Sequence, residues 1–426
     1  MNLSQNRPLR LATLCTLYLS QGLAFGFVSI SLASHLAARG IDMAEVGALI
    51  MMTTLPWTLK PVWGAVIDAV GPTRWGRRRP WLVAAQTGMA ASLLTILLLP
   101  DLATQITALV VLVGLHNLFV SLQDVATDAL AVDLLTPAER GRVNGFMYGS
   151  SYLGTSIAGA GLGLLMTRFG LPAAVTVQAV ASLLIMLVPL LVRERGSDVR
   201  IFGGREEPDP DAPARIPFLE SIARFTADLV TAFHEKSAWL AAVFAALLKI
   251  PIGIISVVLV VLTIQRLGWT KEEYDIVMSV TNWFGLGGAL AGGFLADRFG
   301  VRRVAAVTSL ATAAVWLAFG LLSSFWTSKT IFKIFLCTHE LLVSVLAVAC
   351  FAMFMGIAAK KVAATQFSTY MAVFNLSQSF GSKAAGWLDE VVPVATVFVI
   401  LAVFQASITP VLIGIRPRHK NPTPPN

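Results

Sequence analysis

The stretch GGFLADRFGVRR, residues 292–303, decides the fold, and a looser copy of it, WGAVIDAVGPTRWGRRR, occupies residues 63–79. Both copies place glycine first, then one acidic residue, then arginines, and both separate two apolar stretches. Glycine lets membrane helices approach closely, and an acid at the membrane edge can pair with arginines of the following loop. A motif that recurs in the two halves of an apolar chain predicts two related helix bundles around a site at the middle of the membrane.

Charged residues are scarce in this chain. Of its 426 residues, 56% are hydrophobic and 13% are charged, and the mean hydropathy is +0.74. Soluble domains carry roughly 25% charged residues and need polar surface to face water. The composition therefore predicts a membrane protein with several spans. Cys15, Cys337 and Cys350 lie in apolar stretches without a disulfide or metal-ligand spacing, so we expect no metal and no other cofactor.

The apolar segments are long enough to cross a bilayer, which requires ~20 residues each. They lie near residues 11–35, 44–67, 81–100, 103–132, 144–167, 172–192, 238–263, 275–296, 302–323, 330–357, 366–387 and 393–415. The first run lacks a clear cleavage site, so we expect it to remain as the first span. The predicted fold is an all-α membrane protein with twelve transmembrane helices in two pseudo-symmetric six-helix halves. The halves are residues 1–192 and 238–415, with a cytoplasmic linker at 193–237 and a tail at 416–426.

The basic residues predict the orientation. Of the 32 Lys and Arg, 23 fall on one side together with both termini, six fall in the opposite loops and three lie within spans. The positive-inside rule places both termini in the cytoplasm, so the net charge of +8 reflects orientation and not a nucleic-acid surface. In the linker, GGREEPDPDAPARIP (203–217) precedes FLESIARFTADLVTAFHEK (218–236), whose apolar residues recur at helical spacing. We expect an amphipathic helix at the membrane surface.

The stretch QDVATDALAVD, residues 123–133, places carboxylates inside a predicted span. Asp124 and Asp128 share one helix face, roughly 6 Å apart, and each would cost a few kcal/mol if it faced lipid. Lys60 in the second span has the same predicted depth as Asp128, about 12 Å from the cytoplasmic edge. Two readings remain open: a salt bridge that joins spans 2 and 4, or a proton site, because two acids that share one lysine cannot both be ionised cheaply.

The loop acids and arginines differ from these buried charges because they lie at the membrane edge. We predict that they are latches of the state closed toward the cytoplasm, and not ligands of a solute. This group comprises Asp68, Arg77, Arg78, Arg79, Asp133, Asp297, Arg298, Arg302 and Arg303. In the second half, Glu340 is the acid that could pair with Lys249 or Lys383, and we count it with the ion-pair network. Polar and aromatic residues expected to line a central cavity are Gln21, Gln123, Tyr152, Lys249, Trp283, Asn375, Gln378 and Lys383.

Together these stretches resemble a known family. LPWTLKPVWGAVIDAV (55–70), GRRRPWLVAAQ (76–86) and QDVATDALAVDLLTPAERG (123–141) are similar to the AmpG-type muropeptide permease branch of the major facilitator superfamily. The acetyl-CoA transporters belong to the same group, and LLKIPIG (247–253) and ATQFSTYMAVFNLSQSFGSKAAGWL (364–388) extend the resemblance. It implies proton-driven import of a small molecule across a bacterial inner membrane. It also implies roles for the two span-4 acids, for Lys60 and for Lys249.

The chain departs from that branch where the branch carries arginines. Tyr152 replaces one in span 5 and Gln378 replaces one in span 11. Arginine forks suit carboxylates and phosphates, so their loss favours a less anionic, partly aromatic solute, such as the siderophores carried by a related branch. Muropeptide, acetyl-CoA-like and siderophore solutes stay open. An uncoupled facilitator with structural acids is the alternative function. We find no catalytic cluster, expect no enzyme, and expect the monomer in the bilayer to be the functional unit.

Overall fold

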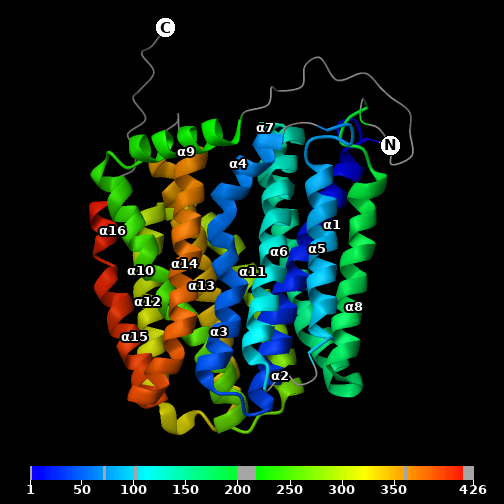
Figure 1. Cartoon of the computed structure of the whole chain (residues 1–426). Helices are drawn as coiled ribbons and strands as arrows, with labels where there is room; N and C mark the ends of the chain where they lie inside the picture. The colour runs from blue at the N-terminus through cyan, green and yellow to red at the C-terminus, as the bar shows by residue number, and fades with distance from the viewer. Residues whose placement is uncertain are drawn as a thin grey trace.

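The computed structural model describes residues 2–70, 73–99, 104–196, 198, 217–358 and 363–415. Within them the chain is a bundle of long helices, and the described ends of the chain lie on one side of it (Figure 1). Twelve transmembrane helices form two halves, as predicted. In the first half the elements are α1 (Arg7–Gly26), η1 (Phe27–Leu32), α2 (Ala33–Ala38), α3 (Met43–Thr54), η2 (Leu55–Leu59), α4 (Lys60–Val70), α5 (Arg79–Ile96), α6 (Ile106–Leu134), α7 (Pro137–Ser156), η3 (Ile157–Leu162) and α8 (Gly163–Leu191).

The second half repeats this plan after a separate helix, α9 (Phe218–Ala232). Its elements are α10 (Lys236–Val261), η4 (Leu262–Arg266), α11 (Lys271–Phe299), α12 (Val301–Leu321), η5 (Ser323–Phe325), α13 (Lys329–Ile357), α14 (Ala363–Val391), α15 (Val394–Ile408) and α16 (Val411–Gly414). Several named elements run on into one another, so α1 with η1 and α2, for example, makes a single crossing.

Not every crossing is continuously apolar. Among the described residues, seven segments are long and apolar enough to span a membrane by themselves, and one of them, 142–191, is 50 residues long. That segment crosses twice, because Gly170 has a left-handed φ of 84° that no other residue type adopts easily and that turns the chain back. The other four crossings are α3 with α4, α5, α11 and α14, and they include Lys60 on α4 and Gln378 on α14.

Close contact between α1 and α7 depends on glycine. A Cβ atom at Gly22 would lie 2.0 Å from the Ser151 carbonyl oxygen, and one at Gly154 would lie 2.3 Å from the Leu19 carbonyl oxygen. Neither position can hold a side chain without moving a backbone. The glycines therefore set the distance between the helices that carry the first-half site.

The two halves share one hydrophobic core on the side away from the termini. This core joins Phe27 and Leu49 of the first half to Val258 and Trp316 of the second, all fully buried. On the terminus side the core divides in two. One part there contains only first-half residues and the other only second-half residues. The protein is therefore closed at the end opposite the termini, and its halves separate toward the termini.

Direct contacts seal the closed end. Thr54 Oγ1 lies 2.8 Å from Ser379 Oγ, and Ser156 Oγ donates to the Ser279 carbonyl oxygen at 2.9 Å. A Cβ at Gly47 would lie 2.4 Å from the Ser382 carbonyl oxygen, so α3 and α14 touch backbone to backbone. Such contacts exclude a solute path through this end.

Helix α9 lies in the linker, at the position where we expected an amphipathic helix. It lies across the terminus side against α4 of the first half and α14 of the second (Figure 1). Thr365 Oγ1 of α14 donates to Asp228 Oδ2 of α9 at 3.3 Å. Leu219 and Val230, on its outer face, are 80% and 69% exposed. The helix therefore spans both halves at the end where their cores are separate.

Candidate functional site

The first-half site is built around a buried ion pair. The α3 helix tightens into the 3₁₀ turn η2, which begins with Pro56 in its first turn, and α4 then starts at Lys60. The Lys60 ammonium pairs with Asp124 Oδ2 of α6 and also lies over the Trp57 ring, 4.6 Å from its centroid. Gln21 Nε2 of α1 donates to Asp124 Oδ1 at 2.9 Å. Asp124 is only 2% exposed, so this carboxylate is held by one charge and one amide.

Asp128 lies one turn along α6 in a different environment. Its side chain is exposed, on the side where the two halves are separate. The Tyr18 hydroxyl donates to Asp128 Oδ1 at 2.5 Å, and the Tyr18 ring meets the Tyr148 ring edge-on with centroids 5.7 Å apart. One face of α6 therefore presents two acids, of which one is buried with a lysine and the other is exposed beside two phenols.

This arrangement can bind and release a proton. Asp128 accepts a hydrogen bond from a neutral hydroxyl, so it can be protonated without breaking an ion pair. Protonation of Asp124, in contrast, would break its ion pair with Lys60. The two acids are close enough that the charge on one affects the other. The structure thus brings together Lys60, Asp124, Asp128 and Gln21, as the sequence predicted for the first three, and adds Tyr18, which the sequence analysis missed.

Gln123 does not belong to this group, although we expected it to line the cavity. It is fully buried, and its Nε2 donates to the Leu17 carbonyl oxygen at 3.1 Å and to Thr127 Oγ1 at 3.0 Å. Its amide therefore joins α6 to α1. Adjacent residues on a helix point about 100° apart, so Asp124 can face Lys60 while Gln123 does not.

Glu340 of the second half lies close to Tyr152 of the first half. A Cβ atom at Gly285 would lie 3.0 Å from Glu340 Oε1 and 3.1 Å from Tyr152 Cε1, so this glycine leaves room for both. Lys249 lies over the Phe374 ring, 5.0 Å from its centroid. Within the described part of the chain no ion pair shorter than 4 Å joins Lys249 to Glu340. The acid and the lysine are therefore separate charges on facing helices.

The remaining residues that we expected to line the cavity differ in exposure and position. Asn375 and Gln378 are half-buried on α14, and their side chains form no hydrogen bond with the described residues. Trp283 is 51% exposed on α11. Lys383 is exposed near Glu45 and the contact between Gly386 and Ala44 at the closed end, away from Glu340. The expectation of a mid-membrane Lys383–Glu340 pair was therefore wrong.

The loop after α4 is held by carboxylates at the terminus side. Arg78 Nε pairs with Asp133 Oδ2 at 2.9 Å, as expected for a latch, but both residues belong to the first half. The sequence analysis missed Glu194, which accepts the backbone N–H groups of Arg77, Arg78 and Arg79 at 3.1, 2.7 and 2.5 Å. Burial raises the pKa of Glu194 even though those amides favour its ionised form. Glu194 satisfies amides at the start of α5 that would otherwise lack acceptors.

The corresponding second-half loop is not latched. Arg302 donates to the Ile415 carbonyl oxygen at 3.1 Å, while Asp297, Arg298 and Arg303 are exposed and form no ion pair with any described residue. The side chain of Asp68 lies outside the described residues. Latches that join the two halves are therefore not found among the described residues, in agreement with the separated cores on this side.

A second buried ion pair occurs at the closed end. Lys271 Nζ lies 2.5 Å from Asp275 Oδ2 and donates to the Gly163 carbonyl oxygen of the first half at 3.1 Å. A Cβ at Gly163 would lie 2.2 Å from Asp275 Oδ2. The sequence analysis placed Lys271 in an outer loop and did not predict its contact with the first half. The spacing of four residues between Lys271 and Asp275 could have predicted their ion pair.

The sequence matches the models of known protein families. The model of the BT1 family matches residues 21–310. The chain belongs to the BT1 family. A second model, that of the Major Facilitator Superfamily, matches residues 241–426. The anhydromuropeptide permease of Escherichia coli K12 is 24% identical over 387 residues, which are 89% of this chain and 74% of the permease.

Solved structures agree on the fold. The nucleoside transporter NupG superposes with a TM-score of 0.68 at 14% identity, over 97% of this chain and 99% of NupG. A D-xylose–proton symporter superposes with a TM-score of 0.66 at 14% identity, over 96% and 98% of the two chains. This BT1-family chain therefore has the major facilitator fold and is similar to the anhydromuropeptide permease. Its family and fold are those of transporters and not of enzymes.

Proposed function

We propose that this protein is a proton-coupled importer of a small organic solute, working by alternating access in the bacterial inner membrane. The observation that carries the proposal is the pairing of Lys60 with the buried Asp124, beside the exposed Asp128. A titratable carboxylate at this depth, on the side where the halves are separate, can exchange its proton with that side. Closing that side and opening the other would present the same group to the opposite solution.

The charge distribution gives the proposed direction. Of the 32 Lys and Arg, 23 fall on the terminus side of the chain, so we assign this side to the cytoplasm. The structure then represents the state open to the cytoplasm, in which solute and proton leave. A proton enters a cell down its electrochemical gradient, which adds about 2.3 kcal/mol per charge per 100 mV. Import driven by this gradient is the expected direction, with the monomer as the working unit.

For the solute, we propose a muropeptide-like compound with a sugar and a peptide part. Support comes from the similarity to the E. coli permease over 89% of this chain. Lys249 and Glu340 offer one charge of each sign, and Tyr152 stands between the halves beside Glu340. Such a set suits the free amine and carboxylate of a peptide better than a polyanion such as acetyl-CoA.

Uptake into proteoliposomes tests this choice. Radiolabelled anhydromuropeptide, acetyl-CoA and a ferric siderophore are offered separately to the wild-type protein and to Lys249→Met and Glu340→Gln. We expect uptake of the muropeptide, with a loss of at least about tenfold in either variant, because removing one charge-assisted contact costs about 1.5 kcal/mol or more. Siderophore uptake without muropeptide uptake would refute the proposed solute but leave transport itself intact.

An uncoupled facilitator is the second candidate, and the burial of Asp124 favours it. A carboxylate that is 2% exposed and paired with Lys60 also serves to join α4 to α6. In this case the solute moves only down its own gradient and no proton moves with it. Solute accumulation against its gradient when only a pH gradient is imposed excludes the facilitator.

A further inference from the structure

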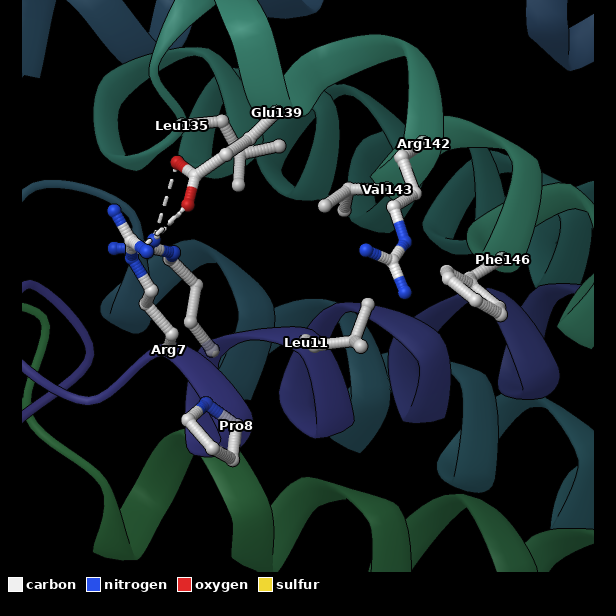
Figure 2. Close-up of a pocket in the computed structure, with 9 residues that line it drawn as sticks. Arg7, Pro8, Leu11, Leu135, Glu139, Arg142, Val143 and Phe146 are labelled. Carbon is white, nitrogen blue, oxygen red and sulfur yellow. Dashed lines mark hydrogen bonds and ion pairs between the residues drawn. The ribbon is translucent and has the colours of Figure 1, made fainter.

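A pocket lies at the terminus side of the first half, between α1 and α7 (Figure 2). Its volume is about 600 Å³. The residues that line it come from the first turns of α1 and α7 and the segment before α7: Arg7, Pro8, Arg10, Leu11, Leu135, Glu139, Arg142, Val143 and Phe146. The pocket thus combines arginines with an apolar wall, at the end of the helices that we assign to the cytoplasmic membrane surface.

On α7, the pocket residues lie on a different face from the transport site. Phe146 of the pocket and Tyr148 of the transport site are two residues apart, so they point about 200° apart around α7. Phe146, Leu153 and Ile157 follow one another at helical spacing and are 48%, 41% and 48% exposed. An apolar stripe therefore runs from the pocket toward the middle of the membrane, on the face of α7 opposite the acids.

The pocket carries more positive than negative charge. Glu139 accepts hydrogen bonds from Arg10 at 3.2 and 3.3 Å and pairs with Arg7 Nε at 3.2 Å. Hydrogen bonds from Thr136 and the two arginines hold the pKa of Glu139 below its usual range, so Glu139 stays ionised. Arg142 has no carboxylate within 4 Å among the described residues. Its guanidinium lies 5.8 Å from the Phe146 ring and extends between α1 and α7 (Figure 2).

We propose that this pocket binds an anionic phospholipid, with the phosphate on Arg142 and Arg7 and an acyl chain along Phe146, Leu153 and Ile157. A guanidinium offers a planar fork that matches phosphate oxygens, and basic pockets between transmembrane helices on the cytoplasmic side suit lipid headgroups. The apolar wall and the stripe below it favour an amphiphile over free phosphate. The lipid would join α1, which carries Tyr18 and Gln21, to α7, which carries Tyr148.

Lipid retention measured by native mass spectrometry tests the proposal without relying on transport. The full-length protein in detergent is titrated with dioleoylphosphatidylglycerol, dioleoylphosphatidylcholine or inorganic phosphate, as wild type, Arg142→Ala, Arg142→Lys and the matched control Arg303→Ala. Arg303 is an exposed arginine on α12 far from the pocket. Thermal unfolding of each variant in the same detergent confirms that it is folded.

We expect phosphatidylglycerol to bind at least tenfold more tightly than phosphatidylcholine. Arg142→Ala should lose about tenfold of this affinity, because one charge-assisted contact contributes about 1.5 kcal/mol. Arg142→Lys should fall between, because it keeps the charge but loses the fork, and Arg303→Ala should match the wild type. Equal affinity in Arg142→Ala and wild type would overturn the proposal. Thermal stabilisation by inorganic phosphate equal to that by the lipid would also overturn it, in favour of a soluble anion.

Discussion

Replacing Lys60 with methionine should destabilise the first half in a pH-dependent way. The substitution leaves Asp124 with one hydrogen bond, the 2.9 Å contact from Gln21, in a site where it is 2% exposed. An uncompensated buried carboxylate can avoid its charge by taking up a proton. At pH 7 this costs about 4 kcal/mol, because the ordinary pKa of aspartic acid is about 3.9 and each pH unit corresponds to 1.36 kcal/mol. At pH 5 the same step costs about 1.5 kcal/mol.

The value at pH 7 lies within the about 3–5 kcal/mol that buried ion pairs cost when they lose one partner, and the value at pH 5 is smaller because protonation is easier there. If the first half unfolds as one unit, with a Tm shift of roughly 2–4 °C per kcal/mol, Lys60→Met should lower Tm by roughly 8–16 °C at pH 7 and roughly 3–6 °C at pH 5. Tryptophan fluorescence during heating in lipid nanodiscs measures this, since the chain has 10 tryptophans.

The control is the double variant Lys60→Met, Asp124→Asn, in which no buried charge remains and the amide can still bond Gln21. It should recover most of the lost Tm and show little dependence on pH. An unchanged Tm in Lys60→Met at both pH values would refute the buried ion pair as a determinant of stability. Failure of Asp124→Asn to restore stability would refute the uncompensated charge as the cause.

Three further variants test other parts of the structure. Glu194→Ala should lower the free energy of unfolding by about 1–3 kcal/mol, because three backbone amides lose their acceptor; a wild-type Tm would contradict this. Gly47→Leu should hold the closed end apart. A cysteine introduced by Thr54→Cys, in a background without the three native cysteines, should then react faster with a membrane-impermeant maleimide. Equal reaction rates with and without Gly47→Leu would contradict the closed contact. Tyr18→Phe should move the pH midpoint of uptake upward by about one unit, since the lost bond favours ionised Asp128 by about 1.5 kcal/mol, and an unchanged pH profile would contradict its role.

The sequence predicted the parts of the fold that depend on local pattern. Runs of apolar residues defined the crossings. Helical rise predicted a shared depth for Lys60 and Asp128, whereas the lysine pairs with Asp124, one turn away on the same face. Glu194 escaped notice because its role is to accept backbone amides from a loop more than 100 residues away in the chain. The contact of Lys271 with the opposite half escaped for the same reason, since it depends on how two bundles meet.

Rotation about a helix was the other limit. Gln123 directly precedes Asp124, but its side chain points about 100° away around α6 and bonds the α1 backbone. Its polarity alone could not show which face of α6 it occupies. Lys383 was placed too deep, because glycine contacts such as Gly386 on Ala44 put its part of α14 at the closed end. The second-half charges depend on the relative placement of α10 and α13, which no pattern along one helix specifies.

Proton movement with the solute tests the central claim most directly. Proteoliposomes with a trapped pH-sensitive dye hold the wild type, Asp128→Asn, or Asp133→Asn as a matched control at the membrane edge. Anhydromuropeptide is added without an imposed gradient. We predict acidification of the lumen with solute entry in the wild type and in Asp133→Asn, and its loss in Asp128→Asn. Solute entry with no change in pH, equal in all three proteins, would contradict proton coupling and leave the acids with a purely structural role.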